Sequence, residues 1–222
     1  MSESCLVAEN ISLLKGEHHL LDDISLRLRA GQITSVMGHN GAGKTLLLSM
    51  LHGLVMPSAG RIKTPAGNTQ KMIFQTPVLM RRSAHAHFSF ASGIYDKDEI
   101  EFWFQKANLM HRYQTAARHL SSGEAQKLAV ISALATAPDI LFADEPTANL
   151  DADSRTEIEA LLVSARGAGT SVMLITHSLA QAKRLSDHLI YMDKGAMLDH
   201  ETAEAFFAGK RSKKASLFLE NL

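Results

Sequence analysis

Residues 33–54 place an apolar run, a glycine-rich loop and an amphipathic segment in direct succession. The run ITSVM at 33–37 is followed at once by GHNGAGKT at 38–45, and LLLSMLHGL at 46–54 comes next. Nearly continuous apolar runs are typical of parallel strands covered on both faces, whereas the third segment has the pattern of a helix. The succession therefore predicts a buried strand, a tight turn and a helix, and with them a parallel sheet.

Two later runs repeat this pattern. ILFA at 140–143 and SVMLIT at 171–176 are again nearly continuous in apolar residues. Between them, residues 152–169 carry apolar side chains at i, i+3, i+4 and i+7 before a glycine, which predicts a crossover helix. Strands that alternate with such helices indicate an α/β fold with ligands at the carboxyl ends of its strands.

The rest of the chain predicts two additions to this core. Residues 5–37 have the pattern of short strands, and the alternation in ISLRLRA is typical of a half-exposed antiparallel sheet. From 76 to 118 the strand pattern disappears, and DKDEIEFWFQKANLM has apolar residues at helical spacing. We expect a single domain over 1–222, with an α/β core from 1–75 and 119–222 and a small helical subdomain inserted at about 76–118.

The loop at 38–45 matches G-x-x-x-x-G-K-[ST] in the strand and helix context that a phosphate-binding loop requires. Glycines let backbone N–H groups turn towards a β-phosphate, and the helix start adds partial positive charge. Lys44 would reach the β and γ oxygens, and the Thr45 hydroxyl would bind Mg²⁺. A turn that only caps a helix would not need this lysine. The candidate nucleotide-binding residues here are Gly38, His39, Asn40, Gly41, Ala42, Gly43, Lys44 and Thr45.

Two acids follow the run ILFA. Asp144 is placed to hold Mg²⁺ through water, and Glu145 is placed to orient or deprotonate an attacking water. A solvated turn would explain an acid pair by itself. Next to a phosphate-binding loop, the pair predicts a site for phosphoryl transfer.

Further motifs occur in a fixed order along almost the whole chain. Gln75 follows a strand, and LSSGE, ILFADEP, NLD and ITHS come after it. In order and approximate spacing this set resembles the ABC ATPases, and the resemblance implies binding and hydrolysis of ATP with Mg²⁺. It implies a catalytic set of Glu145, His177 and Gln75, and a Mg²⁺ set of Thr45, Gln75 and Asp144.

LSSGE at 120–124 resembles the signature of that family, usually LSGGQ. A serine and a glycine at a helix start expose a hydroxyl, backbone N–H groups and the positive end of the helix dipole, which together suit a γ-phosphate. The same groups form an ordinary N-cap. The resemblance implies a head-to-tail homodimer, in which Ser121 and Gly123 reach the ATP of the other subunit and Asp151 crosses the interface.

Three positions depart from the family pattern. Ser122 stands in place of a glycine and Glu124 in place of a glutamine, so we expect activity that is lowered but not lost. The family usually stacks adenine on an aromatic side chain, but the matching position is about Lys15, with Leu14 beside it. We expect adenine to rest on an aliphatic surface and to be bound more weakly or less selectively.

Composition narrows the choice of partners and compartment. Lys plus Arg and Asp plus Glu number 23 each, so no positive excess favours nucleic acid. The single cysteine, Cys5, suits a reducing compartment, and the first ten residues do not have the pattern of a signal peptide. No uncharged run reaches the about 20 apolar residues of a membrane span. The pairs His18-His19 and His85/His87 lack cysteine or acid neighbours at metal-ligand spacing, which favours surface roles.

Three functions remain open: the ATPase subunit of a membrane transporter, an ABC ATPase of repair or translation, or an ATP-dependent switch. The chain has no coiled coil, zinc module or second ATPase half, which favours the transporter, with separate transmembrane permease subunits and a solute-binding protein. Such a subunit would lie at the cytoplasmic face of the inner (plasma) membrane. The segments 38–54, 74–91 and 200–222 look most like ATPases of tungstate-type oxyanion importers.

The resemblance also indicates where the membrane partner docks. In that family the segment at 74–91 meets the permease. Arg81 and Arg82 within it would either pair with acids of the permease or remain a solvated surface pair.

Overall fold

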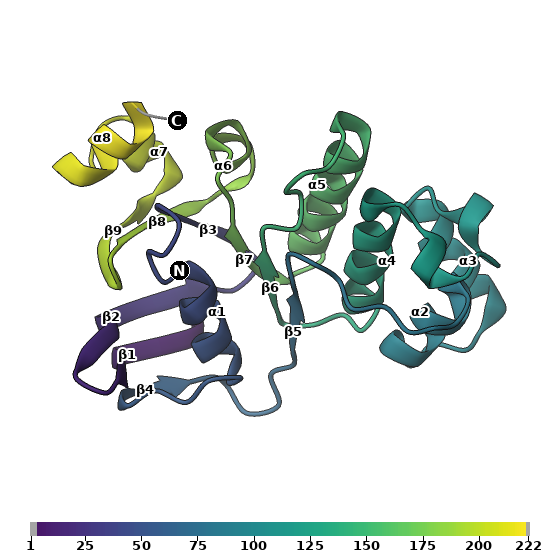
Figure 1. Cartoon of the computed structure of the whole chain (residues 1–222), viewed down its shortest axis with the longest axis horizontal. Coiled ribbons are helices and arrows are strands. Elements are labelled where there is room, and N and C mark those ends of the chain that lie inside the picture. Colours follow the sequence, from purple (N-terminus) through teal and green to yellow (C-terminus); the bar gives the residue numbers. More distant parts are fainter. Residues whose placement is uncertain (1–3, 221–222) are drawn as a thin grey trace.

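A six-stranded sheet forms the centre of the structure, a computed structural model that describes residues 4–220 (Figure 1). Its strand order is β5-β6-β7-β3-β8-β9, and neighbouring strands are parallel except for the antiparallel pair β8 and β9. The strands are β3 (Ile33–Met37), β5 (Gln70–Ile73), β6 (Ile140–Asp144), β7 (Ser171–Ile175), β8 (His188–Asp193) and β9 (Ala196–Thr202).

The central strands are buried on both faces. In β6, Leu141 and Ala143 belong to the core under the helices, whereas Ile140 and Phe142 belong to the core under the second sheet. Every residue of β3, β6 and β7 is buried. The three apolar runs are therefore parallel strands, as predicted from their continuous hydrophobicity.

A three-stranded antiparallel sheet, in the order β2-β1-β4, covers one face together with helix α1 (Lys44–His52). Its strands are β1 (Ser4–Lys15), β2 (His18–Arg29) and β4 (Ala59–Lys63). Both β1 and β2 are longer than the short strands predicted within 5–37, and β2 begins at His18, before ISLRLRA. The reason is an irregular register: Asn10 and Asp23 both have positive φ and are joined by a hydrogen bond of 2.8 Å, so the alternation breaks while the pairing continues.

Helices cover the other face and extend beyond the sheet (Figure 1). Residues 76–118 contain α2 (Ala84–Ser92), α3 (Lys97–Lys106) and a short 3₁₀ helix, Met110–Arg112, and a second 3₁₀ helix, Ala117–His119, runs across the predicted boundary. The fold is thus an α/β core with an inserted helical subdomain. Helix α4 (Ser122–Leu134) packs against both α2 and α5 (Ala152–Gly167), so it joins that subdomain to the core. The exact boundaries at 75/76 and 118/119 stay a prediction.

The carboxyl-terminal helices pack around the far end of the sheet. These are α6 (Leu179–Leu185), α7 (Ala203–Phe207) and α8 (Lys213–Glu220), and their core includes Tyr191, Phe206 and Phe218. Among the described helices none combines the length and the apolar character needed to cross a membrane.

Phe142 tests the importance of this two-sided burial. We expect Phe142→Ala, at a fully buried position in β6, to lower the free energy of unfolding by about 3–5 kcal/mol, because the cavity cannot collapse between two packed faces. Chemical denaturation measures the change. The control is Phe102→Ala on α3, where 55% of the side chain is exposed and we expect less than about 1 kcal/mol. Equal losses in the two variants would contradict this description of the core.

Candidate nucleotide site

The phosphate loop begins where β3 ends, in the middle of the sheet between β7 and β8. Gly38 has φ 150°, and a Cβ there would lie 2.2 Å from the backbone oxygen of Met192 on β8. Only glycine fits because the obstacle is backbone rather than a flexible side chain. The loop continues directly into α1, which begins at Lys44, so the backbone N–H groups of the loop lie next to the N-terminus of a helix.

Lys44 is held inside the loop. Its Nζ donates to the carbonyl oxygens of Gly38 at 2.8 Å and His39 at 2.9 Å, and only 6% of the residue is exposed. Burial lowers the pKa of Lys44, while the nearby carboxylates of Glu145 and Asp144 act in the opposite direction. An ammonium with two carbonyl acceptors and no carboxylate in direct contact can transfer its hydrogen bonds to a phosphate oxygen.

Asp144 and Thr45 lie together at the base of the site. Asp144 ends β6 with 5% exposure, and burial raises its pKa, while a hydrogen bond from the Thr45 side chain acts against the rise. A buried carboxylate beside a threonine hydroxyl is an oxygen donor set of the kind that Mg²⁺ prefers. The residues present therefore fit that ion.

Gln75, Glu145 and His177 converge from three neighbouring strand ends. Glu145 Oε1 lies 2.9 Å from His177 Nε2, and Glu145 Oε2 accepts a hydrogen bond of 3.4 Å from Gln75 Nε2. Glu145 has φ 47°, and its N–H donates to the carbonyl oxygen of Ile175 at 3.2 Å. The end of β7 thus fixes the turn that presents this carboxylate.

These groups surround an open cavity of about 940 Å³. Of the predicted residues, the cavity is lined by Asn40, Gly41, Gly43, Lys44, Thr45, Gln75, Glu145 and His177. Gly38, His39 and Ala42 belong to the loop but not to the lining, and Asp144 is buried beneath it. The lining also includes residues that the sequence analysis did not single out, namely Leu46, Thr147, Ala148, Asn149, Arg155, Thr176 and Ser178.

Some of these additional residues had a sequence signal. Thr176 and Ser178 flank His177 in ITHS, Thr147 and Ala148 lie between the two acids and NLD, and Asn149 is the first residue of NLD. Arg155 had none, because a basic residue one turn into a helix after NLD has the pattern of a solvated side chain. Its guanidinium donates to the carbonyl oxygen of Leu150 at 3.2 Å, and Arg155 belongs to the cavity lining.

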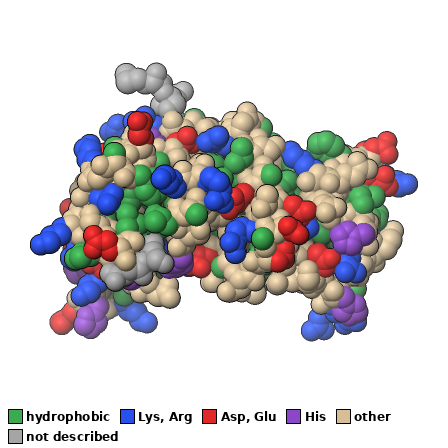
Figure 2. All heavy atoms as spheres, turned by 90° about the horizontal axis from the view of Figure 1, so that it is seen from above, with side chains coloured by type: hydrophobic (Ala, Val, Ile, Leu, Met, Phe, Trp, Pro, Cys, Tyr) green, Lys and Arg blue, Asp and Glu red, His purple; other side chains and the backbone are tan. Residues whose placement is uncertain are grey.

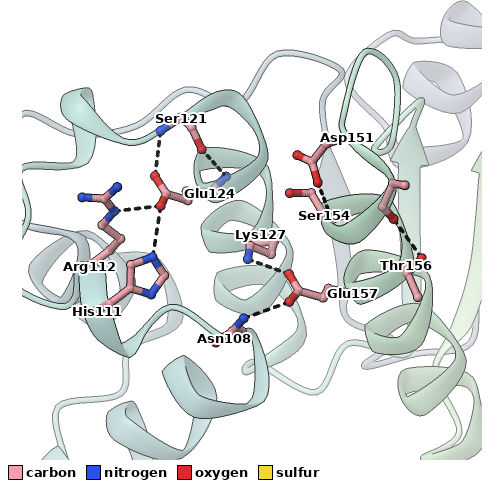
Figure 3. A network of polar contacts seen from close by, with 11 residues as sticks. Asn108, His111, Arg112, Ser121, Glu124, Lys127, Asp151, Ser154, Thr156 and Glu157 are labelled. Carbon is pink, nitrogen blue, oxygen red and sulfur yellow. Dashed lines mark hydrogen bonds and ion pairs between the residues drawn. The ribbon is translucent and has the colours of Figure 1, made fainter.

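The signature residues stand apart from this cavity. Ser121 caps α4 and Asp151 caps α5 (Figure 3). Ser121, Gly123 and Asp151 are all absent from the cavity lining. Gly123 lies beside Asp151, since a Cβ on it would be 3.5 Å from Asp151 Oδ2. The predicted site residues therefore form two groups within one subunit.

Glu124 fixes the conformation of the signature through hydrogen bonds at the start of α4. It completes a capping box: Ser121 N–H donates to Glu124 Oε2 at 2.8 Å, and Glu124 N–H donates to Ser121 Oγ at 3.3 Å. Its other oxygen meets Arg112 Nε at 2.7 Å and His111 Nε2 at 3.2 Å (Figure 3). Burial raises the pKa of Glu124, but these hydrogen bonds outweigh it and leave the pKa at about 2.

The position expected for adenine is at the tip of the β1–β2 hairpin. Leu14 is 41% exposed and Lys15 ends β1, opposite His19 and His18. Neither Leu14 nor Lys15 lines the cavity. The expectation of weaker or less selective binding of the base stays a prediction.

Comparison with known proteins identifies the family. The family described as ABC transporter matches residues 21–148, which include the phosphate loop, Gln75, the signature and the two acids. The chain belongs to this family. It is an ABC ATPase, in agreement with the resemblance of its motifs.

The relatives of this ABC ATPase are named for the transport of different substrates. It is 31% identical over 215 residues to the tungstate uptake system ATP-binding protein TupC of Peptoclostridium acidaminophilum, covering 91% of this chain and 99% of that protein. It is 28% identical to the arginine transport ATP-binding protein ArtM of Bacillus subtilis, covering 96% and 98%. It also matches a putative ABC transporter ATP-binding protein of Methanosarcina mazei at 28%, where it spans 45% of the longer protein.

Solved structures share the fold. One, described as the ATP binding subunit of an ABC transporter, has a TM-score of 0.85 at 23% identity and covers 98% of this chain and 99% of its own. CbiO1 from Clostridium perfringens, part of the complex cbiONQ, has a TM-score of 0.82 at 25% identity, covering 94% and 92%.

Gly38 provides a direct test of the loop in this ABC ATPase. We expect Gly38→Ala to weaken ATP binding by at least about tenfold, since a methyl group cannot share space with the Met192 backbone and the loop must open. The control is Gly67→Ala, because Gly67 also has a positive φ, 83°, but an open Cβ position outside the cavity. Titration with a fluorescent ATP analogue measures both. Wild-type affinity in Gly38→Ala would contradict the loop geometry.

Glu124 provides a pH test. Its pKa falls from 4.5 to about 2 on folding, so its contribution to stability is complete above pH 4.5 and is lost as the pH falls towards 2. We expect Glu124→Gln to lower the free energy of unfolding at pH 7 by about 1–3 kcal/mol, a loss that shrinks below pH 4.5. Urea denaturation across this range measures it. Glu101→Gln, in an exposed pair with Lys97, is the control; a pH-independent loss at Glu124 would contradict the assignment.

Proposed function

We propose that this ABC ATPase is the ATP-hydrolysing subunit of an importer and that it works as a head-to-tail homodimer. One observation carries the proposal: Gln75, Glu145 and His177 converge on the phosphate-loop cavity, whereas the signature of the same subunit stands outside it. The cavity is open to solvent, and the signature groups that would bind the γ-phosphate do not line it, so one copy of the chain holds only part of the proposed ATP site. A second copy supplies the other half.

Within each half, the chain's own groups do the positioning. Lys44 exchanges the carbonyl oxygens of Gly38 and His39 for phosphate oxygens. Glu145 accepts a hydrogen bond from the attacking water and takes its proton, while His177 holds the far side of that carboxylate and contacts the γ-phosphate. Thr45, Asp144 and Gln75 would hold Mg²⁺, which would neutralise charge that develops on the phosphates.

The second copy would bring its signature to the γ-phosphate. Ser121 and Asp151 are both exposed and both start a helix, so they can face another subunit without rearrangement. The backbone N–H groups at the start of α4 and the dipole of the helix suit an anion. Closing the dimer would then depend on ATP, and hydrolysis would reopen it.

The surface beside Gln75 suits a membrane permease. Phe74 and Val78 are 46% and 87% exposed, although both are large and apolar. Arg81 and Arg82 are exposed as well, and neither side chain has an ion pair with any residue from 4 to 220. Buried Gln126 of α4 donates to the carbonyl oxygen of Phe74 at 3.2 Å, so a permease that moves this segment would also move the signature helix.

For the transported substrate we propose an oxyanion such as tungstate, delivered to the permease by a solute-binding protein. Support comes from the similarity to TupC over nearly the full length of both proteins. The similarity to ArtM is almost as high, so another small solute is the alternative. The subunit would bind peripherally at the cytoplasmic face of the inner (plasma) membrane, where its permease presents a docking helix.

A role outside transport, in DNA repair or translation, is the second alternative. On the face shown in Figure 2, basic and acidic side chains are interspersed and no continuous basic surface is present. The balance of 23 basic and 23 acidic residues agrees with this distribution. An ATPase that tracks a nucleic acid backbone would need a positive field of its own.

Glu145→Gln tests the proposed chemistry. We expect ATP binding to persist and the turnover number to fall by at least about a hundredfold, because the glutamine keeps the shape but cannot take a proton. With Mg-ATP present, sedimentation should detect a stable dimer. Near-normal turnover would remove Glu145 from the role. A monomer at all ATP concentrations would contradict the head-to-tail dimer.

The transport partner can be identified with the same variant. Tagged Glu145→Gln protein is purified from native membranes in mild detergent with Mg-ATP. We expect a multi-span membrane protein in stoichiometric amount, and its associated solute-binding protein is then tested with tungstate, molybdate, sulfate and phosphate. A soluble partner without any membrane protein would contradict the transporter assignment.

A further inference from the structure

The starts of helices α4 and α5 lie next to each other (Figure 3). At Gly123 the space between them leaves no room for a side chain. Gly123 is buried in α4, and a Cβ on it would lie 2.4 Å from Ser154 Oγ and 3.0 Å from Ser154 Cβ. Gly123 has no positive φ, so the backbone conformation does not call for glycine. The contact with Ser154 is what excludes a larger residue at this position.

Ser154 has a second contact, with the loop that precedes α5. Its N–H donates to Asp151 Oδ1 at 2.8 Å and so forms the cap of the helix. This hydrogen bond lowers the pKa of the Asp151 carboxyl. The side chain of Ser154 therefore packs against Gly123 of the signature, while its backbone N–H binds Asp151.

A partly buried ion pair joins the same two helices one turn further on. Lys127 lies four residues after Gly123, its side chain is 6% exposed, and its Nζ lies 2.7 Å from Glu157 Oε2. The other oxygen of Glu157 accepts from Asn108 Nδ2 at 3.1 Å, at the end of α3 (Figure 3). A buried ammonium that loses its carboxylate is strongly destabilised, so this pair resists any sliding of α4 along α5.

We propose that Ser154 and Lys127 are positioning residues for the signature. They hold Ser121, at the start of α4, at a fixed spacing from Asp151, at the start of α5, so that both reach the partner subunit as one rigid surface. The inference rests on the head-to-tail dimer proposed above. It gives Gly123 a structural role within its own subunit, in addition to any contact with the γ-phosphate.

A rescue experiment separates the two roles of Gly123. Thermal unfolding and ATP turnover are measured on the full chain for Gly123→Ala, Ser154→Gly and the double variant. We expect Gly123→Ala to lower Tm and to reduce kcat by at least about tenfold, and the double variant to regain the Tm of Ser154→Gly and at least about tenfold in kcat. A double variant no more stable and no more active than Gly123→Ala would overturn the proposal.

Two substitutions of Lys127 with side chains of similar length test the ion pair with Glu157. Lys127→Met keeps the length of the side chain without the charge, and Lys127→Arg keeps the charge. We expect Lys127→Met to lower kcat about tenfold while the affinity of the single subunit for a fluorescent ATP analogue changes by less than about twofold. Lys127→Arg should restore most of the rate. The control is Thr156→Ala on the exposed face of α5, which should keep the wild-type rate.

The outcomes distinguish this inference from the function on which it rests. A wild-type kcat in Lys127→Met, or a loss of ATP affinity as large as the loss of kcat, would overturn the positioning role. Wild-type protein that binds ATP without hydrolysing it would instead contradict the proposed function. The Tm rescue needs no ATP, so it tests the packing of Ser154 on Gly123 in either case.

Discussion

The in-register pairing of the central parallel strands is the constraint on which the site depends. Val36 of β3 and Asp144 of β6 both pair with Ile175 of β7, so the three strands end at one level. The residues that follow these ends carry the chemistry: the phosphate loop after β3, Glu145 after β6 and His177 after β7. Because both faces of the strands are buried, their carboxyl ends are the open edge at which polar groups can gather.

Much of this half of the site follows from the sequence. A continuous apolar run predicts a strand that is covered on both faces, and a polar residue directly after it then lies at the ligand edge. Spacing alone does not predict the close contact of Glu145 with His177 or the hydrogen bond from Gln75. The resemblance to ABC ATPases implied that these residues act together. Arg155 in the cavity lining could not be predicted, because only the tertiary fold brings this residue of α5 to the phosphate loop.

The other half of the site depends on contacts that no local pattern encodes. Glu124 departs from the family's glutamine, and in the structure it completes the capping box and lies within hydrogen-bonding distance of Arg112 and His111. Those two residues come from a 3₁₀ turn of the helical subdomain, and only the tertiary fold brings them to α4. The same holds for Ser154 against Gly123, where two helix starts meet. The lowered turnover expected from Glu124 stays a prediction.

The central claim is that each ATP site combines the phosphate loop of one subunit with the signature of another, and complementation tests it most directly. Lys44→Ala and Ser121→Ala, each inactive alone, are mixed in equal amounts and ATP hydrolysis is measured. The mixed dimer then holds one intact composite site, so hydrolysis should return to about a quarter of the wild-type rate after random exchange of subunits. If mixed dimers form but the mixture hydrolyses ATP no faster than either variant alone, the composite site is contradicted.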